Sequence, residues 1–137
     1  MKKKTAVHFI IIICIALAGA SCKKKKQCSA GAGGNVTVVV FPQHHGKAIP
    51  NKANYPDTVF VKFNTQEFPG TNPALFDAQY IGEAGEDHIH LTGLKCGDYF
   101  IYAVGFDTTI SQRVTGGIPY SFTQTSGEVD LNVPVTE

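Results

Sequence analysis

The chain has 137 residues, of which 43% are hydrophobic and 17% are charged. Seven of its twelve basic residues lie within the first 26 positions, so the rest of the chain carries five basic residues against eleven acidic ones, a net charge of −6. Nucleic acids are bound through basic surfaces, so this acidic body excludes them as partners. The length is that of one domain with an adequate hydrophobic core.

The first residues have the pattern of an exported, lipid-anchored protein. Lysines at 2–4 precede an apolar run at 9–18, which is too short to span a bilayer core of about 30 Å. A Gly-Ala-Ser triplet at 19–21 then leads to Cys22. This junction resembles the lipobox of bacterial lipoproteins, although Gly19 replaces the usual leucine. The resemblance implies that Cys22 is acylated; an ordinary cleaved signal that leaves Cys22 free is the alternative.

We expect the chain to have three parts. Residues 1–21 form a lipoprotein signal peptide that is removed, residues 22–34 form a lipidated, basic and glycine-rich tether, and residues 35–137 form the folded domain. The four lysines at 23–26 either attract anionic headgroups or act as a solvated spacer. The protein is expected in the outer membrane, held by its lipid and facing either the periplasm or the cell surface.

Two cysteines remain once the signal is removed and Cys22 is acylated. They are Cys28 and Cys96. An exported protein meets an oxidising compartment, so the two are predicted to form a disulfide that ties the start of the domain to the turn near residue 96. Separate reduced thiols are the alternative.

The domain is predicted to be all-β, because short runs rich in β-branched and aromatic residues alternate with Gly, Pro, Asn and Asp. Residues 129–135 are apolar at alternate positions, as in a strand with one buried face. Residues 99–106 are apolar on both faces, which predicts a covered central strand. The predicted strands span 36–41, 58–63, 78–82, 88–92, 99–106, 110–114, 118–123 and 128–135. They predict a two-sheet antiparallel sandwich, of Greek-key, transthyretin-like or Ig-like type.

The segment HIHLTGLKCGDYFIYAVGFD at 88–107 resembles the strand–turn–strand core of transthyretin-like and carboxypeptidase-regulatory-like β-sandwich domains. The stretches VTVVV at 36–40, GKAIPN at 46–51 and TVFVK at 58–62 are similar to the first strand, the connecting loop and the second strand of such domains. The whole chain also resembles small lipoproteins of the Bacteroidetes type. These resemblances imply an architecture and a cellular location, but no activity, because a fold does not specify a function.

Four histidines of the domain are candidate metal ligands. His88 and His90 are two positions apart, so in a strand both imidazoles lie on one face, with Cα atoms about 6.6 Å apart. His44 and His45 follow the first predicted strand, and adjacent side chains of an extended chain diverge, so only one of them is expected to join.

Together these histidines predict a three-histidine site for copper or zinc, with Glu86, Asp87 or water as the fourth ligand, provided that the two pairs meet in space. Four solvated histidines without a metal are the alternative.

The sequence favours binding over catalysis. His88-Ile-His90 with Tyr55 and Tyr80 is similar to the iron ligands of intradiol ring-cleavage dioxygenases, but the Arg-Pro that precedes the histidines of that family is missing. Neither a nucleophile elbow nor a phosphate-binding glycine loop is found. We expect a lipid-anchored binding or structural accessory module of the cell envelope, without a cofactor and with an envelope protein or glycan as partner. Copper or zinc handling is the alternative function.

An aromatic residue in the long connection at 64–75 allows two interpretations. Phe68 either packs against the sheet or belongs to a binding loop, as long loops of sandwich folds often do. The aromatic residues Phe100, Tyr102 and Phe106 share one face of the predicted central strand and are correspondingly either covered core or a contact patch.

Overall fold

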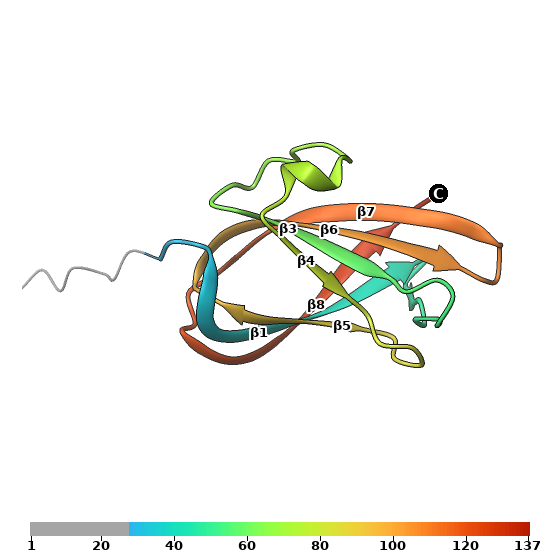
Figure 1. Cartoon of the computed structure of the whole chain (residues 1–137), viewed down its shortest axis with the longest axis horizontal. Coiled ribbons are helices and arrows are strands. Elements are labelled where there is room, and N and C mark those ends of the chain that lie inside the picture. The colour runs from blue at the N-terminus through green and yellow to red at the C-terminus, as the bar shows by residue number, and fades with distance from the viewer. Residues whose placement is uncertain (1–27) are drawn as a thin grey trace, which may run out of the picture.

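The structure is a computed structural model and describes residues 28–137 (Figure 1). The predicted signal peptide and Cys22 lie outside the described residues. Two β-sheets pack face to face, which confirms the predicted all-β, two-sheet sandwich. Within residues 28–137, no helix has the length and hydropathy of a membrane span.

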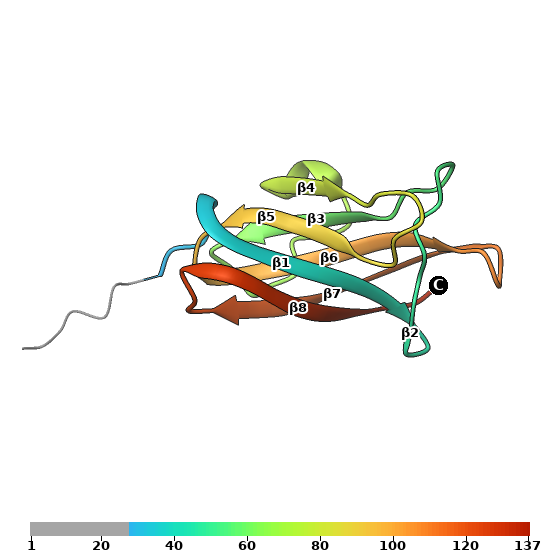
Figure 2. The same ribbon diagram turned by 90° about the horizontal axis from the view of Figure 1, so that it is seen from below.

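Eight strands and one short 3₁₀ turn make up the two sheets. They are β1 (Ala32–His44), β2 (Lys47–Ala48), β3 (Thr58–Phe63), η1 (Pro73–Leu75), β4 (Ala78–Ile81), β5 (Ile89–Leu94), β6 (Gly97–Asp107), β7 (Gln112–Phe122) and β8 (Ser126–Val135). In one sheet β1 lies between β5 and β8, with the short β2 also paired to β1 (Figure 2). The other sheet has the order β4-β3-β6-β7.

One strand pair departs from the predicted antiparallel arrangement. β1 and β8 run parallel over ten residue pairs, from Asn35 opposite Ser126 to His44 opposite Val135. The alternation of apolar residues along a strand is the same in either direction, so the sequence pattern carried no signal for this. The parallel pair brings the last residues of the chain beside the end of β1.

The main core fills the space between the sheets. Alternate residues of β1 (Val36, Val38 and Val40) and of β5 (Ile89 and Leu91) are buried, which confirms that the residues flanking His90 face the core. The predicted inward face of β8 is also confirmed, because its Val133 and Val135 are buried and its Val129 and Leu131 pack against the same core.

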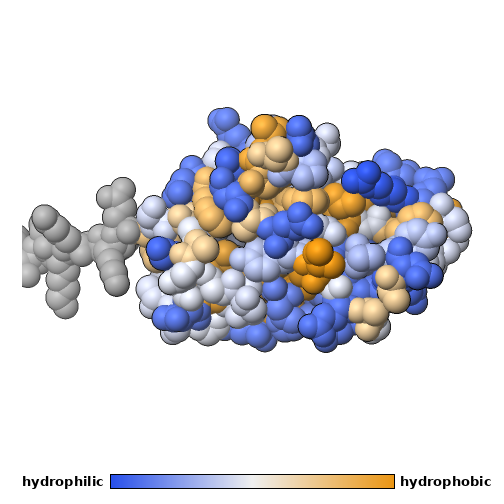
Figure 3. All heavy atoms as spheres, in the orientation of Figure 1, coloured by the Kyte–Doolittle hydropathy of each residue, from blue (hydrophilic) through white to orange (hydrophobic). Residues whose placement is uncertain are grey.

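The central strand β6 is covered on both faces, as its sequence predicts. Tyr99 and Ile101 face the main core, while Phe100 and Tyr102 lie on the outer face. The loop at 64–77 covers this outer face, and the Phe68 ring lies 5.3 Å from that of Phe100 and 5.2 Å from that of Tyr102. Figure 3 shows apolar residues gathered near this loop, which is drawn at the top of Figure 1. The aromatic residues are therefore mostly covered core, although Phe68 itself stays 48% exposed.

The folded domain begins earlier than the predicted boundary between residues 34 and 35. Cys28 and Cys96 form a disulfide, Ala30 is buried in the core, and β1 starts at Ala32. The glycines that suggested a flexible tether instead allow close approach: a Cβ added to Gly34 would lie 2.0 Å from the carbonyl oxygen of Leu94. Glycine-rich sequence here reflects tight packing of backbone on backbone.

A second boundary differs at β7, where two strands separated by Gly116 and Gly117 were predicted. The structure has one continuous strand, Gln112–Phe122. A Cβ on Gly116 would lie 2.1 Å from the carbonyl oxygen of Pro134 in β8, so this glycine admits the neighbouring backbone and does not make a turn.

Candidate functional site

The four candidate histidines fall into two groups on opposite faces of one sheet. His44 points inward in line with the buried residues of β1 and is 5% exposed. His90 lies opposite Val39 across the β1–β5 ladder and points outward with His88, as the alternation around Ile89 predicted. The predicted single site that joins both pairs is therefore wrong, because side chains on opposite faces of a sheet cannot share one ion.

The first group, which we call the outer histidine group, consists of Glu86, His88 and His90. Ligand atoms of all three lie within 4.8 Å of one another. The two Nε2 atoms are 3.1 Å apart, and Glu86 Oε2 lies 3.7 Å from His88 Nε2. Two nitrogens bound to one zinc ion are about 2.9 Å apart at a right angle and about 3.3 Å apart in a tetrahedron. The observed separation already lies in this range.

Carboxylates also lie on the far side of each imidazole in this group. Asp87 Oδ1 lies 3.0 Å from His88 Nδ1, and Glu128 Oε2 lies 3.9 Å from His90 Nδ1. Asp87 accepts a hydrogen bond and so favours a proton on His88 Nδ1, whereas Glu128 lies beyond hydrogen-bonding distance of His90. His88 Nε2 then accepts the hydrogen bond that His90 Nε2 donates, and a metal ion that displaces this proton meets two Nε2 atoms that face each other.

Asn51 fixes the backbone that carries this group. It is 1% exposed, and its side-chain Nδ2 donates to the carbonyl oxygens of Glu86 and His88, each at 3.2 Å. Its backbone N–H also donates to Glu86 at 2.7 Å, and its Oδ1 accepts from the backbone N–H of Asp57 at 2.9 Å. Because every polar group of Asn51 is used, the segment before β5 is held in one conformation.

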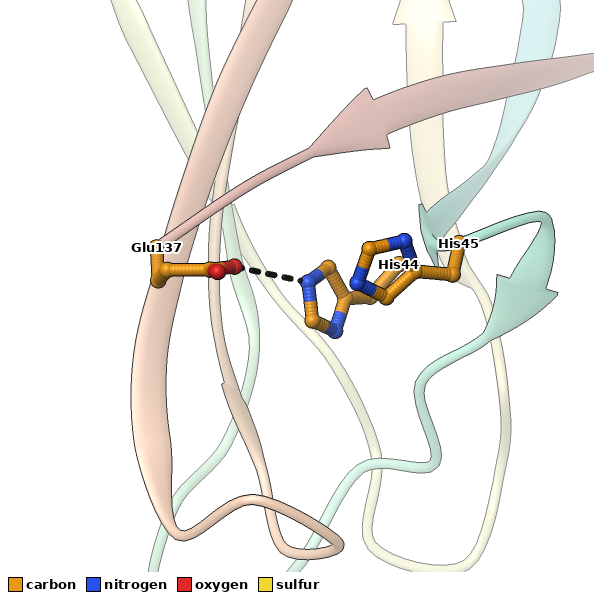
Figure 4. A group of neighbouring side chains, drawn as sticks. All are labelled: His44, His45 and Glu137. Carbon is orange, nitrogen blue, oxygen red and sulfur yellow. Dashed lines mark hydrogen bonds and ion pairs between the residues drawn. The ribbon is translucent and has the colours of Figure 1, made fainter.

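The second group, which we call the end cluster, consists of His44, His45 and Glu137 (Figure 4). It lies where β1 turns into β2 and where β8 ends. His44 Nε2 is 2.9 Å from Glu137 Oε2, and the Glu137 carboxylate points at the His44 ring. On the other side of the ring, His44 Nδ1 is 2.8 Å from Asp107 Oδ2. One buried imidazole is thus held between two carboxylates.

The turn between β1 and β2 returns His45 toward His44. His45 and Gly46 both have positive φ, 49° and 75°, as a two-residue hairpin turn requires. The two imidazole rings consequently lie with centroids 4.1 Å apart. The prediction that adjacent histidines diverge holds for an extended chain and fails here, because the backbone is left-handed at His45.

The charges of the end cluster support one another. The hydrogen bond that His44 Nδ1 donates to Asp107 raises the pKa of His44, and Glu137 raises it further, against the effect of burial. The pKa of Asp107 is lowered to about 2, first by the Thr109 hydroxyl and then by His44. The pKa of Glu137 is lowered by its own backbone N–H and by His44. His44 is therefore stabilised as a cation between two anions.

The tyrosines that suggested a dioxygenase-like iron site lie elsewhere. The Tyr55 ring stacks on Phe106 with centroids 4.5 Å apart, and the Tyr80 hydroxyl donates to the carbonyl oxygen of Thr92. Neither residue belongs to the outer histidine group, so the structure does not assemble that ligand set.

Comparison with known proteins finds no match: no protein-family model, no curated protein and no solved structure is significantly similar to this chain. The similarity to transthyretin-like domains therefore stays a prediction, and the functional argument rests on the two histidine groups.

Proposed function

We propose that the protein binds a divalent transition-metal ion at the outer histidine group, copper more tightly than zinc, as a lipid-anchored protein of the cell envelope. The observation that carries this proposal is the pair of Nε2 atoms 3.1 Å apart, each on a ring whose Nδ1 faces a carboxylate. A divalent ion between the two Nε2 atoms replaces the hydrogen bond that joins them with two ligand bonds and displaces its proton.

The surrounding charge also favours a cation. Glu86 supplies a third ligand, while Asp87 and Glu128 contribute two further negative charges next to the rings. Imidazole nitrogens with one carboxylate suit copper and zinc, and the Irving–Williams order places copper(II) above zinc(II) for a given ligand set.

The ligands are arranged for binding at the surface of a rigid sheet. His88, directly before β5, lies close to His90 on the outer face of β5, and the Asn51 hydrogen bonds hold the preceding segment that carries Glu86. Ligands held in place before the ion arrives lose little conformational entropy on binding.

Acylation of Cys22 would place this surface at the membrane, and we expect Cys22→Ser to release the protein from the membrane fraction, since the acyl chains supply most of its affinity for lipid. Unchanged retention of that variant would contradict the anchor.

Calorimetric titration of the full-length protein in detergent, free of any histidine tag, tests the metal site. We expect saturable copper(II) binding at neutral pH, weaker zinc(II) binding, and loss of the tight copper(II) site in the variant His88→Ala/His90→Ala. Thr92→Ala is the matched control, because Thr92 lies on the same face of β5, two residues beyond His90, and leaves all ligands in place.

Electron paramagnetic resonance of the copper(II) complex gives a second measurement. Nitrogen couplings from two imidazoles are expected in the native protein and in the Thr92→Ala control. Tight copper binding that is indifferent to the His88/His90 replacement, or no saturable binding at all, would leave the role of a structural or partner-binding accessory in the envelope.

A further inference from the structure

We propose that the end cluster is a second metal site, in which His44, His45 and Glu137 bind a divalent first-row transition-metal ion independently of the outer histidine group. The proposal does not rest on the function proposed above, because the two groups share no residue and lie on opposite faces of the sheet.

The ligand atoms already converge. One donor atom from each of the three residues lies within 4.8 Å of the others, and His44 Nε2 is 2.9 Å from Glu137 Oε2. Two ligand atoms each about 2.0 Å from an ion subtend an angle of about 90° at this separation. Figure 4 shows the Glu137 carboxylate directed at His44 with the His45 ring beside it. The arrangement suits two cis positions of a square-planar or octahedral ion, with His45 as the third ligand.

A second layer of hydrogen bonds orients the buried ligand. Asp107 Oδ2 accepts from His44 Nδ1, and Asp107 Oδ1 in turn accepts from the backbone N–H and the hydroxyl of Thr109, at 2.8 Å and 2.6 Å. A carboxylate on the far nitrogen of a ligand histidine fixes its ring and makes the other nitrogen a better ligand. Here it leaves Nε2 as the atom that faces the ion.

The backbone at His45 is held in a conformation that brings a third ligand to the cluster. A positive φ is uncommon for a residue other than glycine, and at this position it turns the His45 ring onto His44. The Glu137 side chain is 55% exposed and His45 is exposed, so dissolved ions have access to the cluster from this side.

Charge balance also favours the exchange of a proton for a metal ion. The carboxylates of Asp107 and Glu137 place two negative charges on either side of His44. A divalent ion at His44 Nε2 balances these two charges, and any proton on that atom is released to solvent. The bound ion would tie the turn after β1 to Glu137, two residues beyond the end of β8, and it would stabilise the folded state because the unfolded chain lacks the site.

The test uses the full-length protein in detergent with the outer group removed by His88→Ala/His90→Ala. Copper(II) and zinc(II) titrations should each show one remaining equivalent of metal per chain, and the metal should raise the melting temperature. Adding His45→Ala/Glu137→Gln should abolish that equivalent. These two replacements spare buried His44, and the urea midpoint of each variant without metal checks that it is folded.

The reciprocal variant, His45→Ala/Glu137→Gln alone, separates this proposal from the first. It should lose one equivalent and keep copper binding at the outer group. The proposal is overturned if the His88→Ala/His90→Ala protein binds no metal, or if its remaining equivalent survives the loss of His45 and Glu137. If the end cluster binds metal while the outer group does not, the result supports the end cluster and contradicts the function proposed for the outer group.

Discussion

The outer histidine group and the end cluster contain the same ligand types, two histidines and one glutamate, in opposite resting states. In the outer group two Nε2 atoms face each other, and the carboxylates lie mainly on the far sides of the rings. In the end cluster both nitrogens of His44 already face carboxylates. In the outer group a metal ion must replace a hydrogen bond between two imidazoles, whereas in the end cluster it must replace the contact between His44 and Glu137.

The two groups also differ in how the chain assembles them. The outer group comes from five consecutive residues, 86–90, whereas the end cluster joins residues 93 positions apart. The first therefore depends on the local conformation before β5, and the second depends on the parallel pairing of β1 with β8. Perturbations of each feature should separate the two groups.

The largest expected effect is a loss of stability that leaves the metal affinities of both groups nearly unchanged. Replacing Cys28 and Cys96 by Ala removes a cross-link across a sequence separation of 68 residues. On the chain-entropy model this costs about 4 kcal/mol of unfolding free energy. The metal affinities of the two groups should change little, because β5 and β1 keep their pairing. Urea unfolding of the double variant measures the loss, and a change below about 1 kcal/mol would show that the cross-link constrains little in the unfolded chain.

Replacing Asn51 should weaken the outer histidine group and leave the end cluster unchanged. Asn51→Ala leaves the carbonyl oxygens of Glu86 and His88 and the N–H of Asp57 without their side-chain partner. We expect a loss of about 3 kcal/mol, since each unsatisfied buried group costs about 1–3 kcal/mol.

The effect of Asn51→Ala on metal binding should be selective. Copper(II) affinity should fall at the outer group and stay unchanged at the end cluster, as measured in proteins with only one group intact. Asn132→Ala is the control, because the Asn132 side chain makes an exposed hydrogen bond to Gln43. Equal loss of affinity in both groups would show that Asn51 supports the fold in general and not the outer group in particular.

The sequence predicted the outer group better than the end cluster for a physical reason. Residues two positions apart in a strand lie on the same face, so the spacing of His88 and His90 was enough to place their imidazoles together. Glu86 and Asp87 directly precede His88 in the chain, so local geometry was enough to place their carboxylates nearby. Glu137 was missed because its contact with His44 depends on the β1–β8 pairing, for which an alternating strand carries no directional signal. A second histidine beside His44 and a glycine after it were the available signs of a tight turn at 45–46.

The same distinction explains the fold-level successes and errors. The strand at 58–63 was predicted with its observed bounds, because apolar and β-branched residues there are flanked by turn residues. The glycines near 34 and 116 were taken as linker and turn, yet each admits a neighbouring backbone from a distant segment. A glycine gives the same signal in both cases, so only the tertiary structure separates them.

Asp57 is a buried carboxylate, and its pKa contrasts with that of Asp107, which lies beside His44 of the end cluster. The pH dependence of stability tests this contrast. Asp57 is fully buried, and within the described residues its Oδ2 atom has no hydrogen-bond partner. Burial raises the pKa of Asp57 from 3.8 to about 6, whereas the pKa of Asp107 beside Thr109 and His44 is lowered to about 2. Between pH 3.8 and about pH 6 the folded state holds a proton on Asp57 that the unfolded state has released. The contribution of Asp57 is therefore fully present below about pH 4 and is lost as the pH rises through 6.

Asp57→Asn removes this dependence. The stability of the native protein relative to Asp57→Asn should fall by about 2 to 3 kcal/mol between pH 4 and pH 7, since one pKa unit corresponds to about 1.4 kcal/mol. Urea unfolding of both proteins at several pH values measures the difference. A constant difference across this range would mean that Asp57 ionises normally in the folded state.

The smallest expected effect concerns the hydrogen bond from His88 to Asp87. Asp87→Asn keeps the size of the side chain and removes the carboxylate that favours a proton on His88 Nδ1, a change that typically lowers metal affinity about 10-fold to 100-fold. The Asp87 side chain is 57% exposed, which places the effect at the low end of this range. Asp130→Asn is the matched control, because Asp130 lies opposite Val39 on the same sheet face and its loss changes the same charge. Equal losses in the two variants would assign the effect to overall charge, whereas a loss confined to Asp87→Asn would assign it to the orientation and protonation of His88.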